Sequence, residues 1–231
     1  PNHNFDKVVE IESRSATTRR LYDGALYDKQ IEWKNTTRFL AYDVTPYDKT
    51  LVIDSDYILN SSILKEAFNQ DHDFQIYRTS FELSGWRNTD EFTRINQYSI
   101  PFYWATVFIF EKNPIVESFF NLVDYIKNNW QYFRMLYNID NPIYRNDFAF
   151  SIAINILNGK TKGDFAIELP GKMVFTSDRD VLITADDTNM KFLIEQEGRL
   201  GEYFLAKTSG IDVHVMNKMS LSRFIDGDSL V

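Results

Sequence analysis

The sequence predicts an α/β fold, with a mixed, mainly parallel sheet flanked by helices and a β-rich C-terminal part. Short apolar runs alternate with helix-like segments up to Gly159, which is typical of a parallel sheet. Beyond it, short strand-like pieces are separated by Asp, Gly and Asn. The 231 residues are 44% hydrophobic and 16% aromatic, which is enough for a sizeable core. We find no linker, so we expect one domain over residues 1–231, with 160–231 as its β-rich part.

Short apolar runs and a capping residue predict the elements of the N-terminal part. Residues 7–11 (KVVEI) and 50–53 have the composition of strands, and the second is apolar enough to be covered on both faces. Residues 35–43 predict a short helix. A serine, Ser61 or Ser62, is placed to cap a helix over 63–68. Two more strands are predicted over 73–78 and 104–110.

The clearest helix signal begins at Asn113, a capping residue followed by proline at the first helical position. A second helix is predicted from Asp147 to about Leu157, closed by Asn158 and Gly159. In the first helix, apolar residues recur at three- and four-residue steps and predict a face packed on the core. They are Ile115, Phe119, Leu122, Val123, Ile126, Trp130, Phe133 and Tyr137. The later strand-like pieces cover residues 164–169, 172–176, 180–184, 202–207 and 211–216.

Composition narrows the function. The formal net charge is −8, which argues against nucleic acid as a partner. The chain has no cysteine, so disulfides and thiolate metal sites are absent, and we expect a reducing, cytoplasmic location. No apolar run is long enough for a membrane span, and no secretory signal pattern opens the chain. The first residue is proline, which suggests a processed chain or a missing start.

The strongest chemical signal is an acid pair, Asp54 and Asp56, after the apolar residues 51–53. A carboxylate at the end of a buried strand is costly to desolvate unless a cation meets it. Residues i and i+2 of an extended chain point the same way, and open α/β sheets bind ligands beyond their strand ends. Carboxylate oxygens suit Mg²⁺ or Mn²⁺, which in turn can hold a diphosphate. The alternative is a solvated turn in which Asp56 caps local backbone.

Residues 33–62 (WKNTTRFLAYDVTPYDKTLVIDSDYILNSS) resemble the region around the D-x-D motif of GT-A glycosyltransferases, above all the glycogenin-like family. The family has a basic helix, a phrase of the type L-T-x-Y-x-K, an apolar strand and the acid pair. Here the phrase is VTPYDK, residues 44–49. The resemblance implies a GT-A, Rossmann-like fold in which Asp54 and Asp56 bind a divalent ion that bridges the diphosphate of a nucleotide-sugar.

The same resemblance implies donor-binding roles for Arg38, Lys34 and Ser55. A surface helix charge is the alternative for Arg38. Residues 102–110 (FYWATVFIF) loosely match a family strand with an N-A-G-V loop on the sugar or acceptor side, through residues 105–107.

Residues 144–153 (YRNDFAFSIA) resemble the family's D-Q-D helix start. Asn146 and Asp147 occupy its last two positions, and Arg145 replaces the first aspartate. The resemblance implies that Asn146 and Asp147 line the donor sugar as catalytic residues. The alternative for Asp147 is a charge that complements the helix dipole.

Residues 211–220 (IDVHVMNKMS) are similar to the family's H-x-x-G-x-x-K element, with a shorter gap and no glycine. The resemblance implies that His214 completes the metal site and that Lys218 contacts the diphosphate; a packed histidine is the alternative. An imidazole beside two carboxylates favours Mn²⁺ over Mg²⁺. The likeness covers residues 7–218, but the usual N-terminal nucleoside-binding strand is expected to be missing.

The expected function is therefore a metal-dependent hexosyl- or pentosyltransferase, of the retaining type by resemblance, with an unidentified acceptor. One alternative is a haloacid dehalogenase-type phosphatase with Asp54 as nucleophile and Asp56 as acid. Lys172 and the pair Asp186-Asp187 would supply its later motifs, although Ile58 stands where that signature has Thr or Val. Another is a non-catalytic sugar-binding or structural GT-A-like subunit.

Overall fold

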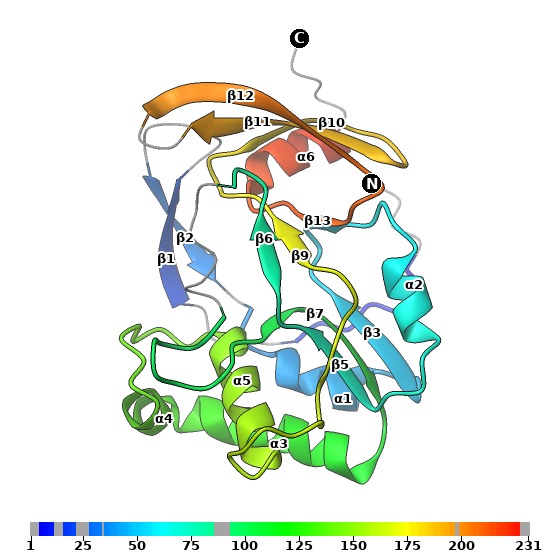
Figure 1. The fold of residues 1–231 in the computed structure, drawn as a ribbon, viewed down its shortest axis with the longest axis vertical. Coiled ribbons are helices and arrows are strands. Elements are labelled where there is room, and N and C mark those ends of the chain that lie inside the picture. The colour runs from blue at the N-terminus through cyan, green and yellow to red at the C-terminus, as the bar shows by residue number, and fades with distance from the viewer. Residues whose placement is uncertain are drawn as a thin grey trace.

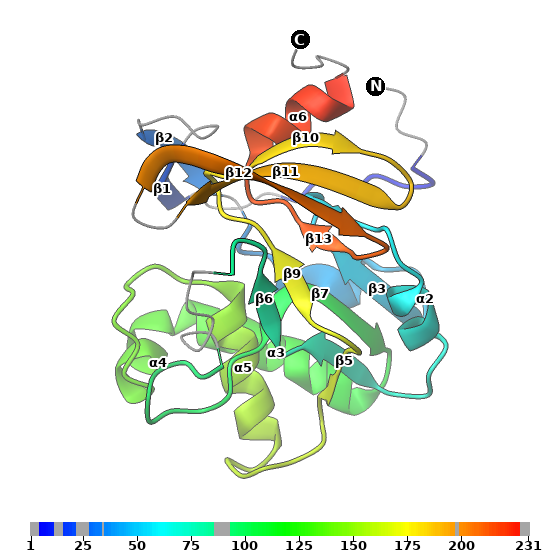
Figure 2. The same ribbon diagram turned by 45° about the horizontal axis from the view of Figure 1, so that its top comes forward.

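The computed structural model describes residues 5–11, 16–21, 28–33, 35–85, 93–196 and 199–226. Helices α3, α4 and α5 lie at one end of the molecule and the sheet β10–β11–β12 lies at the other (Figure 1, Figure 2). The helices are η1 (Arg38–Leu40), α1 (Ala41–Val44), α2 (Ile63–Phe68), α3 (Pro114–Asn128), α4 (Trp130–Leu136), α5 (Asn146–Leu157) and α6 (Lys218–Asp226). The strands are β1 (Ala16–Leu21), β2 (Asp28–Trp33), β3 (Lys49–Ile53), β4 (Tyr57–Ile58), β5 (Phe74–Tyr77), β6 (Ser80–Glu82), β7 (Trp104–Glu111), β8 (Ile167–Glu168), β9 (Met173–Phe175), β10 (Val181–Ala185), β11 (Asn189–Gln196), β12 (Arg199–Ser209) and β13 (Val213–His214).

The fold is α/β with mixed sheets, as predicted, but antiparallel pairings outnumber parallel ones among the described strands, so the expectation of mainly parallel strands is wrong. One sheet has the strand order β3-β7-β5-β8, and β7 pairs antiparallel with both β3 and β5. Strands β3 and β5 therefore run in the same direction, as a strand–helix–strand pattern predicts. The later strand β7 inserts between them in the opposite direction, which no local pattern indicates.

Strand β7 is the centre of the core. Along it, Phe108 and Phe110 pack against α3 and α5, whereas Val107 and Ile109 pack on the opposite face, because side chains alternate along a strand. Its residues 104–110 are all buried. Strand β3 was expected to be the one covered on both faces, but it lies at the sheet edge and all five of its residues are only half-buried.

The C-terminal part is β-rich, as predicted, and it shares a sheet with the N-terminal part. The order of that sheet is β4-β13-β9-β6, in which β13 pairs antiparallel with β4 and parallel with β9. The antiparallel sheet β10-β11-β12 completes this region (Figure 2). Strand β11 and helix α6 were not predicted.

The predicted strand over residues 7–11 is wrong, because these residues are exposed and lie outside any strand. The first strands are instead the antiparallel pair β1 and β2. Within the described residues, no helix combines the length and apolar character that a membrane crossing requires.

Helix α3 begins where the capping signal predicts. Asn113 Oδ1 accepts hydrogen bonds from the backbone N–H groups of Ile115 and Val116, at 3.1 and 2.9 Å. The predicted apolar face is confirmed for Phe119, Val123 and Ile126, which are buried. Leu122 is half-buried, and Ile115, the first predicted residue of the face, is 46% exposed. The helix also ends at Asn128, before Trp130 opens α4.

The Asn113 cap provides a stability test. Asn113→Ala removes the acceptor for two N–H groups at the start of α3, so the free energy of unfolding is expected to fall by about 1 kcal/mol. Urea denaturation followed by circular dichroism measures it. Asn128→Ala, at the other end of the same helix, is the matched control and is expected to change stability by less than about 0.5 kcal/mol. Equal losses in the two variants would contradict the capping role.

Candidate functional site

A cavity of about 530 Å³ opens where β3, β7, β13 and the start of α5 meet. Its volume lies within the range of small-molecule and cofactor sites. Among the described residues, six charged side chains line it: Arg38, Arg145, Lys218, Asp54, Asp56 and Asp147. The cavity therefore gathers most of the side chains that the sequence singled out.

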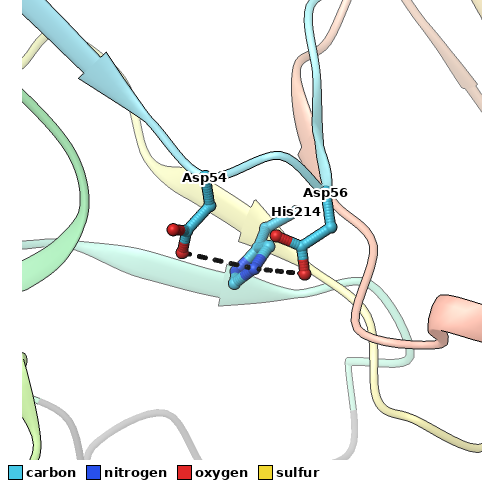
Figure 3. A group of neighbouring side chains, drawn as sticks. All are labelled: Asp54, Asp56 and His214. Atoms are coloured by element: carbon cyan, nitrogen blue, oxygen red, sulfur yellow. Dashed lines mark hydrogen bonds and ion pairs between the residues drawn. The ribbon is translucent and has the colours of Figure 1, made fainter. Parts of the chain in front are cut away.

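Asp54, Asp56 and His214 converge in this cavity (Figure 3). His214 Nε2 lies 3.1 Å from Asp56 Oδ2 and 3.9 Å from Asp54 Oδ2. The prediction that these three residues come together is confirmed, across a separation of 158 positions between Asp56 and His214. The alternative of a simple solvated turn is wrong for Asp56, whose side chain is 5% exposed.

The backbone explains this convergence, although not through the expected extended geometry. The acid pair lies in a turn in which the Tyr57 N–H donates to the Asp54 carbonyl at 3.0 Å. Strand β4 follows directly and pairs with β13, with Tyr57 opposite His214. The N–H of Val215 then donates to the Asp56 carbonyl at 2.8 Å. A turn and a two-residue pairing thus hold the imidazole against the carboxylates.

The three side chains have the chemistry of a site for a divalent cation. One ligand atom from each of Asp54, Asp56 and His214 lies within 4.8 Å of the other two. Two carboxylate oxygens and one imidazole nitrogen suit Mn²⁺, and Mg²⁺ less well, because imidazole is a softer ligand than oxygen. The residues therefore fit the predicted metal, with His214 8% exposed and Asp56 4% exposed.

Two basic side chains contact the acid pair directly. Arg38 Nη2 forms an ion pair with Asp54 Oδ1, and Lys218 Nζ forms one with Asp56 Oδ2. Arg38 was open to interpretation as a surface charge, but its side chain is only 9% exposed. Burial lowers the pKa of its guanidinium to about 10, partly offset by the charge of Asp147 nearby, so Arg38 stays charged at neutral pH. Two of the donor-binding candidates, Arg38 and Lys218, therefore contact the predicted metal ligands.

Asn35 connects the acid pair to α5, and the sequence analysis missed it. Its Oδ1 accepts a hydrogen bond from Arg38 Nε at 3.2 Å, and its Nδ2 lies 3.5 Å from Asp54 Oδ1. Its carbonyl accepts from Asn146 Nδ2 at 2.8 Å. Asn146 is 4% exposed and stands at the start of α5, as predicted. The only signal for Asn35 was its position three residues before Arg38.

The Asp147 carboxylate is held from two sides. Its Oδ1 accepts from the Ala105 N–H at 2.9 Å, and its Oδ2 pairs with Arg145 Nη2 at 2.7 Å. It also lies in the first turn of α5, where a negative charge is stabilised by the helix dipole. Both interpretations of Asp147 are therefore compatible with its position, since it complements the dipole and lines the cavity.

The first residues of β7 form hydrogen bonds with both acidic residues, Asp54 and Asp147. Since β7 runs antiparallel to β3, its first residues lie beside the end of β3, and Ile53 pairs with Val107. The Thr106 carbonyl accepts from the Asp54 N–H at 3.1 Å, while the adjacent Ala105 N–H donates to Asp147. Residues 105–107, matched above to a family strand carrying a loop, lie within the strand itself.

The remaining predicted residues divide into three groups. Ser55 is exposed in the turn and lines the cavity. Lys34 lies outside the described residues. The phosphatase candidates Lys172, Asp186 and Asp187 do not line the cavity, and Asp186 instead accepts hydrogen bonds from the N–H groups of Thr188 and Asn189 in the β10–β11 turn.

The cavity also has apolar and amide groups that the sequence analysis did not assign to a site. They are Trp104, Asn141, Ile143, Phe175 and Met216. Trp104 and Phe175 pack together with ring centroids 5.4 Å apart. They follow the core pattern of their strands, so no sequence signal separates them from ordinary core residues.

Comparison of the chain with protein-family models, with curated proteins and with solved structures gave no match. The function is therefore inferred from the chemistry of the cavity.

Proposed function

We propose that the chain is a metal-dependent glycosyltransferase that moves a sugar from a nucleoside diphosphate-sugar to an acceptor. One observation carries the proposal: two carboxylates and an imidazole converge in a cavity where Arg38 and Lys218 contact the same carboxylates. A divalent cation site beside two positively charged side chains suits a diphosphate, which binds both metals and basic side chains.

The charge of the cavity supports this assignment. Its three basic and three acidic side chains cancel when His214 is neutral. A divalent cation and a diphosphate carrying two negative charges can therefore enter together without leaving a net charge in a partly buried space. A free sugar needs no such charges, which disfavours a plain sugar-binding module.

In the proposed reaction, the bond between the anomeric carbon and the diphosphate oxygen breaks, and a bond from the acceptor oxygen to that carbon forms. The leaving diphosphate keeps the electron pair of the broken bond and takes up the acceptor's proton. Asp54, Asp56 and His214 would hold a divalent cation, which would supply positive charge beside the diphosphate. Lys218 and Arg38 add charge to the same group, since electrostatic stabilisation is strongest where water is excluded.

In this proposal, Asp147 and Asn146 contact the sugar part of the donor. The transition state of glycosyl transfer carries positive charge at the anomeric carbon, as in glycoside hydrolysis. The Asp147 carboxylate, held by Ala105 and Arg145, stabilises that charge. Asn146 provides an amide from the same helix start, fixed by its bond to Asn35.

The direct test is a panel of nucleotide-sugars with Mn²⁺, with nucleoside diphosphate release measured by chromatography and donor binding measured by calorimetry. The expected result is Mn²⁺-dependent binding of at least one donor and release of its nucleoside diphosphate. Binding of free sugar without metal, or hydrolysis of simple phosphomonoesters without diphosphate release from any donor, would contradict the proposal.

Arg145 offers a second test. Arg145→Met removes one of the two groups that hold Asp147, so kcat is expected to fall by roughly 10²-fold because a small displacement of a reacting group is costly. Mn²⁺ affinity is expected to stay within about twofold, because Arg145 pairs with Asp147 and not with the metal ligands. Arg199→Met, a change of the same kind at a side chain 64% exposed, is the control. An unchanged kcat in Arg145→Met would contradict the claim that Arg145 positions Asp147 for the reaction.

A further inference from the structure

The two basic side chains at the acid pair contact the atoms that a metal ion needs. Lys218 Nζ pairs with Asp56 Oδ2, the same oxygen that lies 3.1 Å from His214 Nε2. Arg38 pairs with Asp54 Oδ1, whereas His214 lies 3.9 Å from the other oxygen, Asp54 Oδ2. Asp54 thus keeps one oxygen toward the imidazole, but at Asp56 the lysine and the metal would share one ligand atom.

The two basic residues also differ in their freedom to move. The Arg38 side chain is 9% exposed and is held by Asn35 as well as by Asp54. The Lys218 side chain is 52% exposed and belongs to the first residue of α6. A flexible, half-exposed lysine can leave Asp56 at little cost, since its ammonium can be solvated or can bind another anion. Lys218 is therefore the group that exchanges.

We propose that a divalent cation and a diphosphate bind this cavity as mutually dependent ligands, because the cation displaces Lys218 from Asp56 and the released ammonium binds the diphosphate. This inference deepens the proposed function and rests on its metal site. The cation alone would leave the ammonium without its carboxylate and add two positive charges to a neutral cavity. The diphosphate alone would find Lys218 engaged by Asp56.

Such coupling is reciprocal: each ligand must strengthen the binding of the other by the same factor. Site-to-site coupling in proteins is typically about 5- to 150-fold. If Lys218 both competes with the metal and binds the anion, its removal strengthens the binding of the metal alone and weakens the binding of the metal–diphosphate pair. A lysine with only one of these roles would change only one of the two affinities.

The test compares the wild type with Lys218→Met, with inorganic pyrophosphate as the anion probe. Calorimetry measures the binding of Mn²⁺ alone and of preformed Mn²⁺–pyrophosphate. Free Mn²⁺ is followed independently by its electron paramagnetic resonance signal. In Lys218→Met, Mn²⁺ alone is expected to bind roughly 5- to 10-fold more tightly, and Mn²⁺–pyrophosphate to bind more weakly by a similar factor.

Lys191→Met is the matched control, since Lys191 is exposed on β11 and lies outside the cavity. Both affinities are expected to stay within about twofold of the wild type there. Mn²⁺ binding that is unchanged or weaker in Lys218→Met would overturn the inference. A chain that shows the opposite shifts but neither binds nor cleaves any nucleotide-sugar would overturn the proposed function and leave the coupling intact.

Discussion

Asp56→Asn is expected to lower the rate of sugar transfer by roughly 10²- to 10³-fold, because it removes a carboxylate from the metal site at the centre of the proposed reaction. Mn²⁺ binding measured by calorimetry is expected to weaken in parallel. The variant is expected to fold. Its partner Lys218 is half-exposed and can turn to water, and the new amide can still contact His214.

Asp54→Asn is a less specific test of the metal site than Asp56→Asn. Arg38 is buried against Asp54, and a buried charge left without its partner costs about 3–5 kcal/mol of stability. Loss of activity in that variant would therefore combine loss of metal with loss of structure.

The control for Asp56→Asn is Asp48→Asn, the same change at an exposed residue just before β3. Its activity and Mn²⁺ affinity are expected to match the wild type. Transfer by Asp56→Asn within threefold of the wild-type rate would show that the acid pair does not hold a catalytic metal, and the glycosyltransferase proposal would then be abandoned.

Phe119→Ala is expected to lower the free energy of unfolding by about 3–5 kcal/mol, because it opens a cavity in the aromatic core between α3, α5 and β5. The Phe119 side chain is fully buried. Its ring centroid lies 4.6 Å from that of Phe74, 5.1 Å from that of Phe150 and 5.3 Å from that of Phe165. Urea denaturation measures the free energy, and the melting temperature is expected to fall by about 6–20 °C.

Ile115→Ala, one turn earlier on the same helix, is the control. Ile115 is 46% exposed, so its truncation is expected to cost less than about 1 kcal/mol. A loss below 1 kcal/mol for Phe119→Ala would contradict the packing described here, and similar losses for both variants would contradict the assignment of the buried face.

Local signals in the sequence predicted the elements that depend on them. The cap at Asn113, the end of α5 at Asn158 and the run of β7 are set by residues next to one another in the chain, and the structure confirms them. The direction of β7 depends on which strands it joins, and pairing partners are not encoded in the periodicity of a single strand. The same limit explains why residues 7–11 were wrongly assigned as a strand, because they pair with no strand in the part of the chain that the structure describes.

In the candidate site, too, the sequence predicted some residues and missed those whose roles depend on tertiary contacts. Asp54, Asp56 and His214 were predicted together because residue types with metal-ligand chemistry stood in a recognisable order. Asn35 and Arg145 were not assigned roles, because their importance comes from contacts made only after folding. An asparagine before a helix and an arginine at a helix start are ordinary surface residues in most sequences.

Two neighbouring residues of β7 bind the two acidic residues: the Thr106 carbonyl accepts from the Asp54 backbone N–H, and the Ala105 N–H donates to the Asp147 carboxylate. The distance between the Asp54 backbone and the Asp147 carboxylate is thus set by two adjacent, buried residues of β7. A substrate cannot widen or narrow that gap without breaking the core. In the proposed reaction, movement that admits a donor is therefore expected at Lys218, the half-exposed first residue of α6, so ligand-dependent changes in hydrogen exchange are expected at the start of α6 and not in β7.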